Sequence, residues 1–444
     1  MGFIINLFSR SDPTWRARGR GSPLEIIADL HIHSRFSRAT SEDMTLPNIA
    51  RFARIKGLDV VGTGDFTHPR WLAELREELA EFEDSHLYVI RGSEGVKFAL
   101  SSEVNTTFEF QGSSRKVHHV IMAPDFDVVD QINDAISGFG DLAADGRPSL
   151  DVSPAHLVEV LHSISDDVVI FPSHAWTPWY GIFGSVSGFD ALEDCYGDKS
   201  DEIFAIETGL SSDPPMNWRL SKLDRFSLVS NSDAHSPWPW RLGREANIFL
   251  LERLSYEGIV GAMKARDPSR FKSTIETDPA YGKYHWSGHR DCGVAVPGDR
   301  AIALGNVCPK CGRPLTKGVE QRVEELADRP KGFVPKGAIP FVRILPLSEI
   351  IAEALGSSSP SSAGVWRVYN SLVGHFGDEL EVLLRADARE IAGASSQEVA
   401  EAILKVRDGV VDIEPGFDGV YGRIRIPRGP SGGGRRGARL EDFL

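Results

Sequence analysis

The stretch EIIADLHIH, residues 25–33, ends an apolar run with two histidines one residue apart. The run has the composition of a buried strand, and side chains at positions i and i+2 of a strand point to the same face. We therefore expect His31 and His33 to lie side by side, which is what a metal ion needs from two imidazoles. Because two histidines can also be chance neighbours, the prediction depends on further ligands at other strand ends.

Residues 25 to about 235 alternate between strand-like apolar runs and amphipathic helical segments. Strand-like runs include LDVVGTGD, KVHHVIMAPD and DVVIFPSH, and helical segments include LPNIARFARIKG and PAHLVEVLHSI. This alternation favours a parallel sheet, either open or closed as a barrel. A barrel of βα units builds its active site at the carboxyl ends of its strands.

Titratable residues gather at the ends of these runs. They are His31, His33, Asp65, His174, Asp233 and His235. Histidines scattered through a core would have no reason to gather at strand ends, so the pattern favours a metal site at one edge of the sheet.

The order of these residues resembles the PHP superfamily of metal-dependent phosphoesterases. The resemblance implies an α/β fold with a distorted (βα)7 barrel that holds two or three divalent metal ions. The ligands it implies are His31, His33, Asp65, Glu103, His118, His119, His174, Asp233 and His235. Of these, Asp65, Asp233 and His235 are also expected to act in catalysis. Zinc, manganese or iron suits such mixed ligands better than magnesium.

Several ligand assignments stay open at this point. Glu94 competes with Glu103, and only one of His118 and His119 is expected to bind, since strand neighbours face opposite ways. Many PHP proteins have a histidine directly after the aspartate of the second strand, whereas here His68 is displaced. An acidic residue that often follows the first histidine pair is also missing, so we expect one metal position to be altered.

A second metal motif follows residue 285. The motif His289-x2-Cys292-x15-Cys308-x2-Cys311 contains two chelating pairs at the spacing of a zinc ribbon. Four protein ligands leave no open coordination position, which indicates a structural zinc ion. His285 is the alternative fourth ligand.

The segments KYHWSGHRDCG, CPKCGRPLTKGVEQRVEELADRP and PGFDGVYGRIRI make the chain similar to the endonuclease Q family over residues 25 to about 426. That resemblance implies a DNA repair endonuclease that nicks 5′ of hypoxanthine, uracil and xanthine and at abasic sites. The alternatives are a phosphatase acting on a small phosphomonoester, a non-catalytic DNA-binding scaffold, and a barrel that binds metal without activity.

Changes in composition divide the chain into five expected parts. These are a disordered N-terminal extension (1–22), the barrel (23–280), a zinc-binding module (281–339), a C-terminal helical domain (340–426) and a disordered tail (427–444).

Aromatic residues close to the predicted metal ligands are candidates for a base pocket, although each of them can equally pack the rim of the barrel. They are Trp176, Trp179, Tyr180, Phe183, Trp238 and Trp240. Extruded bases stack on such rings. Arg241 and Arg244 are candidates for phosphate contacts, as are Lys310, Arg313 and Lys317 of the zinc module.

The last residues, GARLEDFL, resemble the motif that docks repair enzymes onto the sliding clamp PCNA, with Leu440, Phe443 and Leu444 as the inserted side chains. Gly437 stands where glutamine is usual, and a tail folded back on its own barrel is the alternative. No apolar run approaches the ~20 residues of a membrane span. The start lacks the features of a secretory signal, so we expect a cytoplasmic protein without a membrane partner. The net charge of −14 restricts DNA contacts to local patches.

Overall fold

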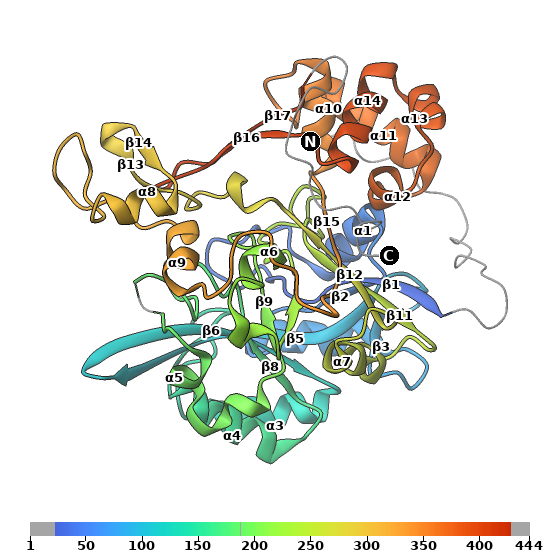
Figure 1. Ribbon diagram of the computed structural model, residues 1–444. Coiled ribbons are helices and arrows are strands. Elements are labelled where there is room, and N and C mark those ends of the chain that lie inside the picture. The colour runs from blue at the N-terminus through green and yellow to red at the C-terminus, as the bar shows by residue number, and fades with distance from the viewer. Residues whose placement is uncertain (1–22, 187, 428–444) are drawn as a thin grey trace.

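The computed structural model describes residues 23–186 and 188–427 (Figure 1). The predictions of disordered ends fall on 1–22 and 428–444, outside the described residues. The same holds for the predicted clamp contacts of Leu440, Phe443 and Leu444.

Within the described ranges, eleven strands form one mixed sheet at the centre of the molecule, in the order β15-β12-β11-β1-β2-β5-β4-β3, with β6 and β7 paired to β5 and β8 paired to β6. The strands are β1 (Leu24–Asp29), β2 (Val60–Gly62), β3 (Leu79–Glu81), β4 (Tyr88–Ile90), β5 (Lys97–Phe110), β6 (Ser113–Ala123), β7 (Ser149–Asp151), β8 (Val169–Pro172), β11 (Ala246–Leu251), β12 (Phe271–Glu276) and β15 (Phe341–Arg343). A separate parallel pair consists of β9 (Ala205–Glu207) and β10 (Ser227–Val229).

The expected parallel sheet is wrong in part, because several of the pairs are antiparallel. β1 runs parallel to β2, and β2 to β5, but β1 pairs antiparallel with β11, and β6 with both β5 and β8. Gln111 and Gly112 between β5 and β6 have φ angles of 50° and 74°, which is the geometry of a two-residue hairpin loop. Strands joined by so short a loop have to run antiparallel.

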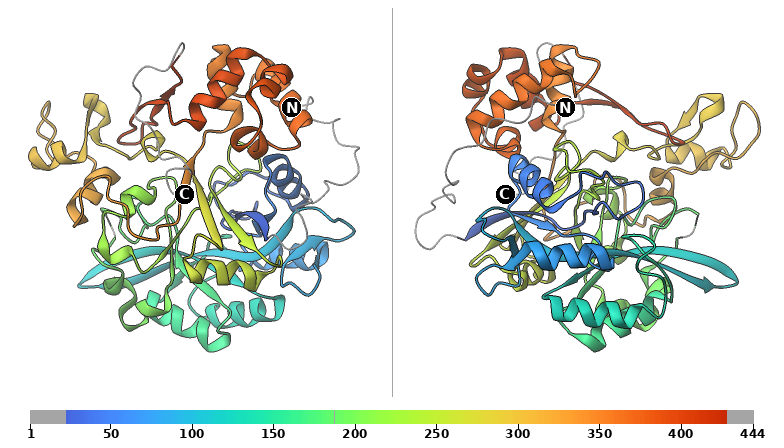
Figure 2. Two further views of the ribbon diagram at one scale, coloured as in Figure 1. Left: turned by 45° about the vertical axis from the view of Figure 1, so that its right-hand side comes forward. Right: turned by 180° about the vertical axis from the view of Figure 1, so that it is seen from behind.

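Helices cover the outside of this sheet (Figures 1 and 2). They are α1 (Leu46–Lys56), α2 (Pro69–Glu78), α3 (Phe126–Ile136), α4 (Pro154–Ile164), α5 (Leu192–Tyr196), α6 (Pro214–Asn217) and α7 (Tyr256–Ala265). The apolar positions Leu46, Ile49 and Ala53 of α1 are buried, as their helical spacing predicts. The helix ends where Gly57 takes a left-handed φ of 103°.

The predicted zinc-binding module is an excursion between two strands of the main sheet. It contains β13 (Ser287–His289), β14 (Val294–Val296), α8 (Gly298–Ala303) and α9 (Val319–Leu326). After it, β15 returns to pair in parallel with β12. β15 therefore belongs to the central sheet, although its residues fall in the range expected for the helical domain.

The helical part follows β15 and consists of α10 (Leu347–Leu355), α11 (Ala363–Phe376), α12 (Glu379–Leu384), α13 (Ala388–Ala394) and α14 (Gln397–Arg407). A final hairpin of β16 (Asp412–Glu414) and β17 (Arg423–Arg425) extends from these helices to the zinc-binding module (Figure 1). Phe417 in its loop bridges to Trp286, and Asp418 accepts hydrogen bonds from the backbone N–H of Arg290 and from Thr316 Oγ1.

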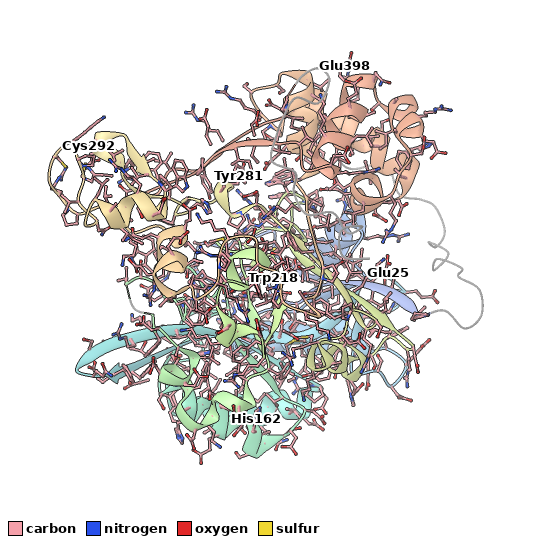
Figure 3. The ribbon with its side chains drawn as sticks, in the orientation of Figure 1. Glu25, His162, Trp218, Tyr281, Cys292 and Glu398 are labelled. Atoms are coloured by element: carbon pink, nitrogen blue, oxygen red, sulfur yellow. The ribbon has the colours of Figure 1, made fainter. Side chains whose placement is uncertain are left out.

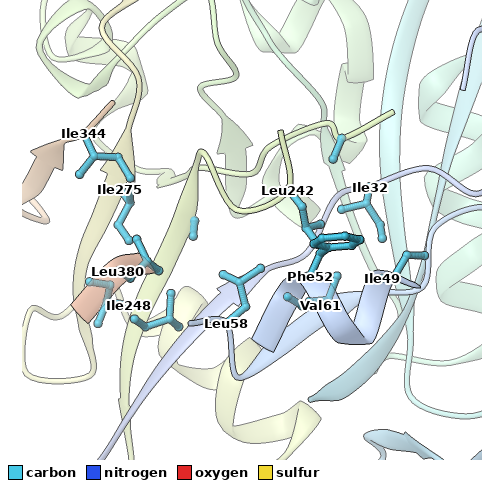
Figure 4. Close-up of a cluster of buried hydrophobic side chains, with 14 of the residues drawn as sticks. Ile32, Ile49, Phe52, Leu58, Val61, Leu242, Ile248, Ile275, Ile344 and Leu380 are labelled. Carbon is cyan, nitrogen blue, oxygen red and sulfur yellow. The ribbon is translucent and has the colours of Figure 1, made fainter. Parts of the chain in front are cut away.

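One hydrophobic core joins the sheet to the helical part. Leu380 of α12 lies with Ile248, Ile275 and Ile344 of the sheet region, as the close-up in Figure 4 shows. The position of the helices relative to the sheet is therefore fixed by buried apolar surface. None of the helices in the described ranges has the length and apolar character that crossing a membrane requires.

Candidate metal centre

Two chain segments meet just beyond the end of β1. The backbone N–H of His33 donates to the carbonyl of Ala234, and that of Asp233 donates to the carbonyl of His31, each at 3.0 Å. This short parallel bridge between Ile32 and Ala234 sets His31, His33 and Asp233 beside one another. The alternation of side chains along a strand, read from the sequence, thus brings both histidines to one cluster.

The first group of converging ligands consists of His31, His33, Glu103 and Asp233, whose ligand atoms all lie within 4.8 Å of one another. Nε2 of His33 lies 3.1 Å from Oδ1 of Asp233 and 3.3 Å from Oε2 of Glu103. Nε2 of His31 lies 3.8 Å from the same two oxygens. Both Nε2 atoms and Asp233 Oδ1 are buried and make no hydrogen bond. Buried polar atoms rarely stay unpaired, so this donor set fits a metal ion.

The second group uses the other oxygen of Glu103. Its Oε1 lies 2.9 Å from Nδ1 of His118 and 2.9 Å from Nε2 of His174, and these two nitrogens lie 3.3 Å apart. Glu103 therefore faces the first group with Oε2 and the second with Oε1. A carboxylate in this position can bridge two neighbouring metal ions.

Two further carboxylates orient the histidines of the first group. Nδ1 of His31 lies 3.0 Å from Glu207, and Nδ1 of His33 lies 3.0 Å from Oδ1 of Asp65. A carboxylate at Nδ1 keeps the proton there and leaves the lone pair of Nε2 for a metal ion. Asp65, expected as a ligand, stands in neither group and holds a ligand in place. The residue at 146 is glycine because a Cβ atom there would lie 2.4 Å from Asp65 Oδ2.

Charge and burial set the protonation of the second group. Burial alone raises the pKa of Glu103, but its hydrogen bonds with His118 and His174 and the charge of Arg147 bring it well below its ordinary value. Burial lowers the pKa of His118 to about 4. A charged carboxylate beside a neutral imidazole is the state in which both can bind a metal ion.

Three residues of the site have an unusual backbone conformation. Asp65, His174 and Asp233 have φ angles of 51°, 30° and 48°, in the left-handed region that residues other than glycine rarely adopt. Such strain is retained where the surrounding structure fixes it, and it clusters at functional sites.

The structure places the other candidate ligands outside both groups. The ring of His235 packs 4.5 Å from that of His33 and borders the cluster. His119 points to the opposite face of β6, where its imidazole lies between Thr106 and the Tyr196 hydroxyl. His68 stacks on Phe36, and Glu94 is exposed on a loop.

Sequence reasoning missed Glu207, Arg147 and Ser173. Glu207 ends β9, so its strand-end position in IFAIETGL was a usable signal. Arg147 and Ser173 contact Glu103 at 3.1 and 2.8 Å. Ser173 directly follows β8 and had the same strand-end signal, whereas Arg147 lies in a segment without a distinguishing pattern.

The cysteine motif also forms a compact group. Ligand atoms of His289, Cys292, Cys308 and Cys311 lie within 4.8 Å of one another, in the module at the left of Figure 3, where Cys292 is labelled. His285, the alternative fourth ligand, is not part of this group. The three sulfur donors and one nitrogen suit zinc.

The aromatic candidates divide into core and surface residues. Trp176 is a core residue rather than part of a base pocket, because it is 1% exposed and its indole N–H donates to Asn217. Phe183 is buried against it. Trp179 and Tyr180 are exposed.

Trp238 and Trp240 are half-buried and stack on each other at 5.7 Å. Trp240 also packs 5.6 Å from Trp366 of α11, so this pair joins the loop after Asp233 to the helical part. Arg244 donates to the carbonyl of Ser232, and Arg241 is partly exposed nearby on the same loop.

The chain is similar to one family model and to two uncharacterized proteins. The family model of the MJ0043 C-terminal domain matches residues 346–410. The uncharacterized protein MJ0043 of Methanocaldococcus jannaschii is 35% identical over 256 residues, which cover 56% of this chain and only 31% of that protein. The uncharacterized protein YqxK of Bacillus subtilis is 26% identical over 421 residues, which cover 90% of this chain and 99% of YqxK.

The match to a solved structure is nearly complete. The crystal structure of PfuEndoQ from Pyrococcus furiosus, described as a novel lesion-specific endonuclease, has a TM-score of 0.81 and 36% identity, and the match covers 91% of this chain and 96% of that one. This chain belongs to the endonuclease Q family. A second structure, of endonuclease Q with a 27-mer duplex carrying an abasic lesion at the active site, has a TM-score of 0.80 at 36% identity, and covers 91% and 97% of the two chains.

Membership of the endonuclease Q family confirms two predictions made from the sequence. The fold is of the α/β class with a PHP-type barrel, a further module and a C-terminal helical part. The chain is an enzyme of the hydrolase class that acts on DNA phosphodiester bonds.

Proposed function

We propose that this member of the endonuclease Q family is a metal-dependent repair enzyme that nicks DNA on the 5′ side of hypoxanthine, uracil and xanthine and at abasic sites. The observation that carries the proposal is the pair of ligand groups that share Glu103. The related enzyme in complex with an abasic duplex supports the lesion class.

We assign one divalent ion to each group. His31, His33, Glu103 and Asp233 would hold the first, and Glu103, His118 and His174 the second. The imidazole and carboxylate ligands favour zinc, manganese or iron over magnesium. Divalent ions held there would supply the Lewis acidity that phosphodiester hydrolysis needs.

Other residues beside the ligand groups neutralise charge, transfer protons or contact the phosphate. Arg147 offsets the charge of Glu103, from which it lies 3.1 Å away. His235 borders the cluster with a side chain that is 32% exposed, so we assign it proton transfer to or from the substrate. Arg241 is our candidate for a phosphate contact beside the cluster.

The base must leave the duplex before a nuclease can inspect it, which costs least for mispaired or damaged bases. Tyr180, which stacks on His118, and its chain neighbour Trp179 are exposed aromatic residues, and we assign them to the base pocket. We assign a structural zinc ion to His289, Cys292, Cys308 and Cys311. The clamp contact and the cytoplasmic location stay predictions from the sequence.

The deciding experiment uses duplexes with a single hypoxanthine, uracil or abasic site and an undamaged duplex of the same sequence. Each is incubated with the full chain in manganese, in magnesium or in EDTA. Asp233→Asn is the inactive control, since it removes a ligand carboxylate without changing the size of the side chain. We expect nicks 5′ of the lesion only in the damaged duplexes with metal, and none with Asp233→Asn.

Other outcomes would replace the proposal. Phosphate release from monoesters without nicking would identify a phosphatase, and retardation of DNA without cleavage would identify a scaffold. Nicking by Asp233→Asn at the rate of the natural chain would show that Asp233 is not a metal ligand needed for catalysis.

A further inference from the structure

Four aromatic side chains stand on segments that contact one another between the metal cluster and the zinc-binding module. They are Trp179, Tyr180, Tyr284 and Tyr421, and we call them the aromatic strip. Trp179 is 39% exposed, Tyr180 41% and Tyr421 54%, whereas most large apolar side chains of the described residues are buried. They come from three separate parts of the chain.

The inner end of the strip rests on a predicted metal ligand. The ring of Tyr180 stacks on that of His118, with centroids 5.2 Å apart and planes 7° from parallel. The backbone N–H of His118 also donates to the carbonyl of Tyr180 at 3.1 Å. Tyr180 has a φ of 65°, an unfavourable conformation for a bulky residue. This strained turn holds the ring against the second ligand group.

The strip continues across two other segments. The ring of Trp179 meets that of Tyr284 edge to face, with centroids 4.7 Å apart. The loop of the β16–β17 hairpin docks on the same segment, because Gly419 N–H donates to the carbonyl of Lys283 and Gly422 N–H to that of Tyr281, each at 3.1 Å.

Tyr421 lies on this loop, with its ring 6.3 Å from that of Tyr281. Tyr281 is labelled in Figure 3 between the zinc-binding module and the helices. The outer end of the strip therefore depends on the hairpin, which the contacts of Phe417 and Asp418 hold on the module.

Cations accompany the rings in a chain of net charge −14. Nζ of Lys283 lies 4.6 Å from the centre of the Tyr421 ring, and Nζ of Lys116 lies 5.7 Å from that of Tyr180. Aromatic faces alternating with cations are how proteins hold unpaired nucleotides, because each base stacks on a ring while its phosphate meets a positive charge.

We propose that the aromatic strip holds unpaired nucleotides of the strand that is cut, by stacking their bases on Tyr180, Trp179, Tyr284 and Tyr421. The inference rests on the proposed function, because extrusion of a base leaves unpaired nucleotides next to the ligand groups. It adds Tyr284 and Tyr421 to the DNA-binding residues and gives the C-terminal hairpin a direct role in substrate binding.

The test measures binding of a short undamaged single-stranded oligonucleotide, and of the duplex of the same sequence, to the full chain without added metal and without a chelator. The variants are Tyr284→Ala and Tyr421→Ala, with Tyr421→Phe as the conservative variant. Phe333→Ala is the matched control, since Phe333 is also an exposed aromatic residue but lies outside the strip. Thermal unfolding midpoints check that the variants fold.

Each alanine variant should weaken binding of the single strand by about tenfold, the loss expected for one base stacked on a ring. Duplex binding should fall much less, and Tyr421→Phe and Phe333→Ala should bind as the natural chain does. Unchanged single-strand binding in both alanine variants, or equal losses on single strand and duplex, would overturn the proposal.

The nicking assay separates this inference from the proposed function. Specific nicking by the natural chain together with unchanged binding in the alanine variants would reject the strip alone. Selective loss of single-strand binding without any nicking by the natural chain would support the strip and reject the proposed function.

Discussion

Nζ of Lys56, at the end of α1, lies 2.8 Å from Oε1 of Glu379 in α12, and both side chains are buried. Glu379 also accepts hydrogen bonds from the Tyr369 hydroxyl and from the backbone N–H of Leu347. This buried ion pair connects the barrel to the helical part, 323 residues further along the chain.

Replacing Lys56 by methionine should destabilise the protein strongly, because it leaves the charge of Glu379 buried without its partner. We expect Lys56→Met to lower the free energy of unfolding by about 3–5 kcal/mol. Urea unfolding followed by tryptophan fluorescence measures the change. Arg425→Met is the control, since it removes an exposed ion pair with Glu414, which is worth about 1 kcal/mol or less. Similar losses in both variants would contradict the assigned role.

Glu207 orients His31, so its charge should matter for metal binding. We expect Glu207→Gln to weaken binding of the barrel metal by about 10–100-fold, because the amide is a poorer partner for the Nδ1 proton. Titration of metal into the stripped protein measures the affinity. Glu202→Gln is the matched control, since Glu202 also contacts a histidine Nδ1, that of His162 in α4 (labelled in Figure 3), and neither residue belongs to a ligand group. An unchanged affinity in Glu207→Gln would exclude the orienting role.

Cys308 is a buried member of the cysteine group. Cys308→Ser should lose one equivalent of zinc and lower the midpoint of thermal unfolding, because a closed zinc site contributes directly to folding. Elemental analysis of the purified protein counts the zinc. Cys195→Ser is the control, since Cys195 is buried in the core outside this group and its loss should leave the zinc content intact. The four-ligand assignment is wrong if Cys308→Ser retains all of its zinc.

Glu276 at the end of β12 should make stability depend on pH. Burial raises the pKa of Glu276 to about 8, although Thr274 donates to its carboxyl group. The folded state thus keeps a proton that the unfolded state loses near its ordinary pKa of 4.5. The group therefore contributes stability that is fully present below pH 4.5 and is lost as the pH rises toward about 8.

Glu276→Gln mimics the protonated carboxyl group and should reduce this loss. The measurement is the midpoint of thermal unfolding of both proteins at several pH values from about 5 to about 9, a range that spans the raised pKa. Parallel pH curves for the natural chain and for Glu276→Gln would show that Glu276 does not titrate in this range.

Much of the candidate site was predictable because it depends on short-range order. The spacing of His31 and His33 places both on one strand face, and His174 and Asp233 stand beyond strand ends, where a barrel collects its functional residues. Glu103 lies within β5 and was expected from the family resemblance. The cysteine motif was predictable for the same reason, since its chelating pairs lie within single turns.

The sequence alone therefore determined the strand and helix periodicity, the two sets of candidate ligands and the resemblance to the endonuclease Q family. Only the tertiary structure decided between His118 and His119, because both lie on one strand and the choice depends on which face the sheet turns toward Glu103. It also decided that Asp65 supports His33, that Glu207 and Arg147 join the site, and that Trp240 packs between Trp238 and Trp366. These contacts join residues far apart in the chain, and their formation depends on how the whole core packs rather than on local periodicity.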